Sequence, residues 1–292
     1  MLKRIISLGL IISSILLFTG CKNLETGVVQ VKPQTSNVSI SQTETKDEEV
    51  DVNPEVDIDT SNIQKGIVTV KYLNTVKGVR IYLLHNYESC AGYDIQDTSK
   101  DTVISLTNGT GTYYIEVAIN DGNTETIIET KSFEAKKVDE FLPYLQSTYA
   151  VYYTEEMTVI KDAKKYTEGI HDVVEKIQRI KGFTIENLDY VKDNEKDYSK
   201  WAYFPNSDEI YREKKGVCTD FATMFAAICR SQNIPCKVVT GYAGSTEELH
   251  VWVEVFNGLS WEIIDLTLEE AVYTYPNCII IPPSSYQAIT VD

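Results

Sequence analysis

Histidine is scarce in this chain, with only three residues, at positions 85, 171 and 250. None of the six cysteines forms a Cys-x-x-Cys pair, and no run of acidic residues follows the EF-hand calcium pattern. Because structural zinc sites draw on clustered cysteine and histidine ligands, we expect no zinc site. We likewise expect no calcium site, and predict neither a metal nor a cofactor.

Positive charge is also in short supply. The chain has 27 basic and 43 acidic residues, which leaves a formal net charge of −16. Such a chain repels the anionic backbone of nucleic acids, so we exclude nucleic acid as a partner. With 292 residues, of which 43% are hydrophobic, it can still bury one sizeable core or two modest ones.

The N-terminal apolar run is too short to be a comfortable membrane span. Ile5–Phe18 covers 14 residues and follows the basic pair Lys3 and Arg4, which predicts a signal peptide over 1–21. Its end, Gly20-Cys21, resembles the bacterial lipobox, although phenylalanine stands at position 18 where leucine is usual. The resemblance implies that Cys21 is lipidated and anchors an extracytoplasmic protein to the cell membrane. Ordinary cleavage, with Cys21 as a bystander, is the alternative.

The next segment, 22–60, is rich in serine, threonine and acidic residues. Its last part, ETKDEEVDVNPEVDIDT, carries eight acidic residues and one lysine. Such a composition cannot bury enough apolar surface to offset the loss of chain entropy. We therefore predict that residues 22–60 form a disordered acidic tether.

Residues 61–137 contain short segments rich in β-branched and aromatic residues, several of them separated by turns such as Asn108-Gly109 and Asp121-Gly122. This pattern predicts a small antiparallel β-sandwich. The predicted strands are GIVTVKYL, GVRIYLLH, TVISL, GTYYIEVAI and ETIIETKSF.

A second domain is predicted over 138–292. Apolar residues recur at helical spacing between Met157 and Ile180. A second helical pattern follows Cys218 and stops at Asn233-Ile234-Pro235, which predicts a helix with one buried face. The apolar positions of that face are Phe221, Met224, Phe225 and Ile228.

Cys218 stands at the start of this predicted helix. There the unpaired N–H groups and the helix dipole favour a thiolate and could also hold a developing oxyanion. Gly216 would let a substrate approach the backbone closely. The alternative is a small buried cysteine that happens to begin a helix. Cys229 and Cys236 fit either a place in the core or a disulfide.

A hairpin pattern brings a histidine and an aspartate together. Two alternating runs flank Asn257-Gly258, a strong hairpin signal. A two-residue turn there places His250 directly opposite Asp265, within reach of a hydrogen bond. A purely structural His–Asp pair is the alternative. With the thiol, the pair indicates nucleophilic catalysis, in which Cys218 attacks a carbonyl carbon, His250 moves the proton and Asp265 orients the ring.

These residues lie in motifs that resemble the transglutaminase-like superfamily, which has a papain-like core. The matching segments are KKGVCTDFATMFAAICRSQNIPCKVVTGY, HVWVEVF and WEIIDLT. The resemblance implies an α+β fold and the catalytic set Cys218, His250 and Asp265. It also implies an aromatic or polar group that completes the oxyanion hole, for which Trp201 and Tyr203 are the candidates. Both could instead pack beneath the active-site loop. Bacterial extracellular lipoproteins of this superfamily are similar in their β-rich segment.

We therefore expect a cell-surface enzyme that transfers or hydrolyses acyl groups of protein or peptide amides through a thioester. A cysteine peptidase and a protein-glutamine acyltransferase fit equally well, with substrates in the cell envelope. The alternative is a non-catalytic envelope-binding or adhesion lipoprotein that keeps a structural remnant of the triad.

Overall fold

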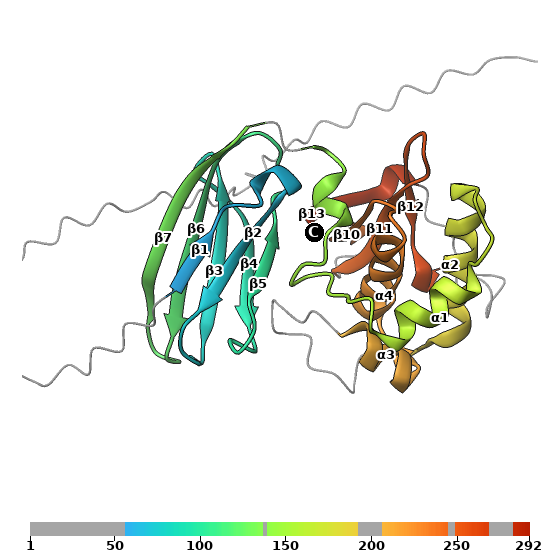
Figure 1. Cartoon of the computed structure of the whole chain (residues 1–292), viewed down its shortest axis with the longest axis horizontal. Coiled ribbons are helices and arrows are strands. Elements are labelled where there is room, and N and C mark those ends of the chain that lie inside the picture. Colours follow the sequence, from blue (N-terminus) through green and yellow to red (C-terminus); the bar gives the residue numbers. More distant parts are fainter. Residues whose placement is uncertain (1–55, 137–138, 192–205, 245–248, 269–282) are drawn as a thin grey trace, which may run out of the picture. The chain divides into compact units, whose positions relative to one another are not determined.

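The computed structural model describes residues 56–136, 139–191, 206–244, 249–268 and 283–292, all within the unit Asp51–Asp292. The predicted signal peptide and residues 22–55 of the predicted tether lie outside these ranges. The fold is α+β, as predicted: antiparallel sheets come first, and helices with a further antiparallel sheet follow (Figure 1).

The N-terminal part consists of two antiparallel sheets. Their inward-facing residues alternate with outward-facing ones and form a separate hydrophobic core, which includes Val68, Ile81 and Ile115. The first sheet has the order β1-β2-β5, with β1 (Val56–Asp59), β2 (Ile67–Tyr72) and β5 (Thr102–Ser105). The second has the order β4-β3-β6-β7, with β3 (Val79–His85), β4 (Glu88–Ile95), β6 (Gly111–Asn120) and β7 (Glu125–Ala135).

Two of these strands were absent from the sequence-based prediction. β1 pairs with β2, so the prediction of a disordered tether is wrong for residues 56–59. The sequence of β1, VDID, alternates apolar and acidic residues, and Ile58 is buried between two aspartates. The acidic residues made this strand resemble the tether. β4 pairs with β3 after a turn through Asn86 and Tyr87, both with positive φ, and contains a glycine that lowers its strand propensity.

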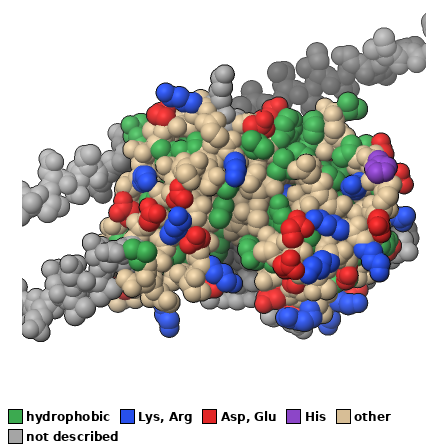
Figure 2. Space-filling model, viewed as in Figure 1, with side chains coloured by type: hydrophobic (Ala, Val, Ile, Leu, Met, Phe, Trp, Pro, Cys, Tyr) green, Lys and Arg blue, Asp and Glu red, His purple; other side chains and the backbone are tan. Residues whose placement is uncertain are grey.

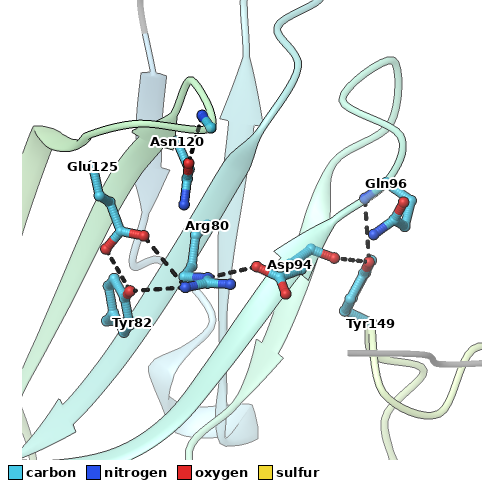
Figure 3. Close-up of polar contacts among 8 residues, drawn as sticks. Arg80, Tyr82, Asp94, Gln96, Asn120, Glu125 and Tyr149 are labelled. Atoms are coloured by element: carbon cyan, nitrogen blue, oxygen red, sulfur yellow. Dashed lines mark hydrogen bonds and ion pairs between the residues drawn. The ribbon is translucent and has the colours of Figure 1, made fainter. Parts of the chain in front are cut away.

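A polar cluster crosses the outer face of the second sheet (Figure 3). Arg80 on β3 donates to Asp94 on β4 at 2.5 Å and to Glu125 on β7 at 3.3 Å, while Tyr82 also donates to Glu125. Beyond the strands, the Tyr149 hydroxyl donates to the Asp94 carbonyl at 2.7 Å. These partly exposed contacts fix strand register more than they add stability.

The C-terminal part combines helices with a four-stranded antiparallel sheet of order β12-β11-β10-β13. The helices are α1 (Thr158–Tyr166), α2 (Val173–Asn187), α3 (Ser207–Glu213) and α4 (Cys218–Ser231). The strands are β10 (Cys236–Ala243), β11 (His250–Phe256), β12 (Trp261–Ile264) and β13 (Tyr286–Val291). A short parallel pair, β8 (Asp189–Tyr190) and β9 (Lys215–Gly216), and three 3-10 turns, η1 (Ile63–Lys65), η2 (Leu142–Leu145) and η3 (Pro283–Ser285), complete the described elements.

The helical pattern between 157 and 180 is divided between two helices. α1 ends before Gly169, whose φ of 77° breaks the helix. α2 then begins with Asp172 as its N-cap, which accepts a hydrogen bond from the Glu175 N–H at 2.8 Å.

The α4 helix lies at the centre of the C-terminal core. It packs against α1, α2 and α3 and against β10 and β11, and every residue from Asp220 to Arg230 is buried. The prediction of one buried face is therefore wrong, because α4 is enclosed on all sides. The small side chains of Ala222, Ala226 and Ala227 let the neighbouring elements pack close to the helix.

Charged side chains of both signs are interspersed on the face seen in Figure 2. No helix of the described ranges is long and apolar enough to cross a membrane.

We predict that Phe225→Ala lowers the free energy of unfolding by about 3–5 kcal/mol, since the fully buried ring would leave a cavity in the core around α4. Urea denaturation measures the change. Leu259→Ala is the control, because Leu259 is 92% exposed and its loss should cost less than about 0.5 kcal/mol. Equal stability of the two variants would contradict the central position of α4.

Candidate active site

Cys218 is the first residue of α4, half-buried at the edge of the core. The preceding N–H, that of Val217, donates to Asp220 Oδ2 at 2.9 Å, so the first turn is closed by an acid from within the helix. Gly216 makes room for this acid, since a Cβ there would lie 2.6 Å from Asp220 Cβ. The space that the sequence analysis gave to a substrate is thus filled by Asp220.

His250 begins β11 directly opposite Gly241 of β10, and Asp265 follows the last residue of β12. The predicted two-residue turn is wrong. Phe256 pairs with Trp261, which leaves a four-residue loop, 257–260. Asn257 Oδ1 closes this loop by accepting from the N–H groups of the two residues before Trp261.

His250 and Asp265 are therefore not directly opposite one another, but the hydrogen bond predicted between them nevertheless forms. The true register differs by two residues, and side chains alternate with a period of two, so Asp265 stays on the face of His250. His250 Nε2 lies 2.7 Å from Asp265 Oδ2. The Cys218 thiol lies close enough to the same imidazole to raise its pKa. Since Asp265 takes Nε2, the other ring nitrogen, Nδ1, is the one available to the thiol.

The family comparison covers this part of the chain. Residues 161–266, which include Cys218, His250 and Asp265, match the model of the transglutaminase-like superfamily. The chain carries a transglutaminase-like domain. The superfamily predicted from the sequence motifs is thereby confirmed for this segment.

Solved structures similar to the chain share little sequence with it. A candidate cysteine protease from Cytophaga hutchinsonii is 17% identical, with a TM-score of 0.42, and the match covers 75% of this chain and 78% of that one. The periplasmic domain of TgpA from Pseudomonas aeruginosa is 11% identical, with a TM-score of 0.36 and coverages of 74% and 94%. Red sea bream transglutaminase is 13% identical, with a TM-score of 0.31 and coverages of 69% and 48%. No curated protein matches the sequence.

Asp265 of the transglutaminase-like domain accepts four hydrogen bonds. Its Oδ2 accepts from His250 and from the Tyr286 hydroxyl at 3.0 Å. Its Oδ1 accepts from the Thr267 hydroxyl at 3.0 Å and from the Leu268 N–H at 3.1 Å. The carboxylate is only 4% exposed, and these donors replace the water that it has lost.

Burial opposes the charged form of both partners, but their pairing outweighs it. Burial lowers the pKa of His250, whereas the hydrogen bonds and charges of Asp265 and Cys218 raise it, to about 10. For Asp265, burial raises the pKa, but the hydrogen bond and charge of His250, helped by Leu268 and Tyr286, bring it below the usual 3.8. At neutral pH the site therefore holds an imidazolium against a carboxylate.

Sequence reasoning missed Tyr286 and Thr267. Thr267 lies two residues after the predicted acid, where a hydroxyl commonly turns back to a neighbouring carboxylate. Tyr286 belongs to β13, whose segment YQAITV has strand propensity but was not assigned.

The described ranges include none of the remaining site residues predicted from the sequence. The oxyanion-hole candidates Trp201 and Tyr203 and the lipidation candidate Cys21 fall outside the described residues and stay predictions. His85 is on β3, beside the Thr110 carbonyl, and His171 is exposed. Within the described ranges, no group of three or more His, Cys, Asp or Glu side chains could hold a metal ion.

The raised pKa of His250 makes the domain's stability depend on pH. Folding favours the protonated ring, so its contribution is complete below about pH 6.5 and is lost as the pH rises through about 10. We predict that the free energy of unfolding falls more steeply over this range in the native sequence than in His250→Gln. Urea denaturation at several pH values measures the two slopes.

The control for this measurement is His171→Gln, which removes an exposed ring and should follow the native slope. The same slope in His250→Gln as in the native sequence would show that His250 is not held as imidazolium.

Proposed function

We propose that the transglutaminase-like domain catalyses cysteine-dependent acyl transfer from, or hydrolysis of, protein or peptide amides. One observation carries the proposal. The His250 ring is hydrogen-bonded to a buried carboxylate, and a thiol at the start of a helix lies close enough to raise the pKa of the same ring. A buried histidine with a structural role needs one acceptor, whereas nucleophilic catalysis needs the thiol as well.

In the proposed reaction, the Cys218 thiolate attacks the amide carbonyl carbon, and the electron pair of the C=O bond moves to oxygen. As the tetrahedral intermediate collapses, the C–N bond breaks and the His250 imidazolium gives its proton to the leaving amine. This leaves a thioester and a neutral ring, which takes a proton from the next nucleophile. Water then releases an acid, or an amine forms a new amide.

The surroundings support each part of this scheme. Asp265 keeps the ring charged and fixes its orientation, and its own four hydrogen bonds hold it in place. The oxyanion would be held by backbone N–H groups in the first turn of α4, where the helix dipole also favours negative charge. Trp201 and Tyr203 remain the proposed side-chain contributors.

For the whole chain we propose an extracytoplasmic enzyme, anchored to the cell membrane through lipidated Cys21 and acting on proteins or peptides of the envelope. The sequence patterns at 1–21 and 22–55 support this location.

The test uses the chain from residue 22 onward, incubated with a peptide library that contains glutamine and a labelled primary amine. Mass spectrometry distinguishes shortened peptides, amine incorporation and conversion of glutamine to glutamate, any of which supports acyl chemistry. We predict that Cys218→Ala lowers the rate at least about 1,000-fold, because the variant lacks the thiol that forms the thioester in the proposed reaction.

Cys90→Ala is the matched control, since Cys90 is a half-buried thiol on β4, outside the matched segment, and its loss should leave the rate unchanged. If none of the three products forms, and Cys218 reacts with iodoacetamide only after denaturation, the proposal is overturned in favour of a non-catalytic binding protein.

We further predict that Asp265→Asn lowers the rate by about 10³–10⁴-fold and moves the alkaline limb of the pH–rate profile to lower pH. Loss of the carboxylate charge lowers the pKa of His250, so the imidazolium that protonates the leaving amine disappears earlier as the pH rises. Asp162→Asn removes a surface carboxylate on α1 and is the control. An unmoved alkaline limb in Asp265→Asn would contradict the assignment.

A further inference from the structure

The Asp265 carboxylate receives a hydrogen bond from a strand that follows it by some twenty residues in the sequence. Tyr286, the first residue of β13, donates its hydroxyl proton to Oδ2 at 3.0 Å. The same oxygen accepts from His250, while Oδ1 is taken by Thr267 and Leu268. Tyr286 is therefore the second donor to the oxygen that faces the imidazole.

A close approach of two strands places Tyr286 there. β13 pairs with β10, and their register shifts beside Gly241, the residue opposite His250. A Cβ on Gly241 would lie 2.0 Å from the Gln287 carbonyl oxygen. Only glycine allows β13 to come this near, and Tyr286 immediately precedes the residue that makes this contact.

The ring of Tyr286 is held on one side by Trp252. The two rings meet edge to face at 5.0 Å between centroids, and Trp252 also stacks with His250 at 6.4 Å. Trp252 is 1% exposed, so it leaves the tyrosine ring little freedom on that side. Packing thus restricts the tyrosine ring from one side, independently of its hydrogen bond.

The hydroxyl contacts the carboxylate oxygen whose position depends on the rotation of Asp265. With Oδ1 held by two donors, the plane of Asp265 can still turn about its Cβ–Cγ bond, which moves Oδ2 relative to His250. A second donor on Oδ2 opposes that turn. We propose that Tyr286 is a positioning residue of the Cys218–His250–Asp265 set, whose hydroxyl keeps Oδ2 directed at His250 Nε2; this inference depends on the proposed function.

Among the described residues, few groups face the imidazole from the elements packed against it. Asp265 and Cys218 interact with it directly, and Tyr286 acts through Asp265. Gly241 and Trp252, its neighbours on β10 and β11, carry no charge. A change at Tyr286 should therefore reach His250 through Asp265.

The experiment is Tyr286→Phe in the chain from residue 22 onward, which keeps the ring and removes the hydroxyl. We expect kcat to fall roughly tenfold with KM unchanged, the effect of losing one hydrogen bond to a charged group. The alkaline limb should move to lower pH by about one unit, because a looser Asp265 stabilises the imidazolium less. A merely structural hydroxyl would leave that limb in place.

A competing role for the hydroxyl predicts a shift of the alkaline limb in the opposite direction. If Tyr286 only shared the charge of Asp265 with His250, its removal would raise the alkaline limb. A limb that stays or rises in Tyr286→Phe therefore overturns the proposal. Tyr211→Phe is the matched control, because Tyr211 also donates to an aspartate, Asp162, at 3.0 Å but lies away from the site. It should change neither kcat nor the limb.

A second measurement separates this inference from the proposed function. The titration of the His250 ring, followed by NMR and assigned with His85→Gln and His171→Gln, needs no turnover. If no substrate is processed but Tyr286→Phe lowers the pKa of His250, the proposed function fails and the positioning contact stands. If turnover occurs and the titration is unmoved, only the positioning role fails.

Discussion

The enclosure of α4 is the constraint on which the C-terminal part depends. The helix is covered by three others and by the sheet, and its residues from Asp220 to Arg230 have lost contact with water. A helix buried in this way cannot slide or rotate without opening cavities on several sides. The position of Cys218 is therefore fixed by the eleven buried residues, Asp220 to Arg230, that follow it in α4. The sheet packs on the same helix, and this packing also fixes the strand that begins with His250.

Electrostatics then works within this rigid frame. Burial alone would neutralise both His250 and Asp265, and their short hydrogen bond reverses that tendency in each. The charged pair is stable because further donors on both carboxylate oxygens replace the hydrogen bonds that Asp265 would otherwise make with water. Thr267, Leu268 and Tyr286 thus contribute to the charge state of the His250 ring through their hydrogen bonds to Asp265.

The sequence predicted the contact between His250 and Asp265 correctly although the predicted strand register was wrong by two residues. The side-chain alternation of a strand depends only on parity, and the actual loop is longer by two residues, which preserves parity. The loop length itself depends on Asn257 binding two backbone N–H groups, which no pattern of apolar residues reveals.

Other features needed tertiary information. Whether α4 is buried on one face or on all of them depends on the helices around it, and its alanines fit either arrangement. The place of β13 beside β10 is a pairing between distant segments, so Tyr286 could not be connected with Asp265 from spacing alone. The first strand was hidden by aspartates that made its segment resemble the acidic residues before it.

The immobility of the helix that carries the thiol has a consequence for protein engineering. In the proposed reaction, the substrate must be brought to the sulfur, because packing holds the helix that carries the sulfur in place. Substitutions inside α4 that are meant to change substrate selectivity would destabilise the fold before they changed which substrate is preferred. The exposed side chains of Tyr242, on β10, and Leu249, just before β11, offer the opposite case, since they can be exchanged at little cost to the core. A library aimed at new substrates should therefore begin at those two positions and leave the helix intact.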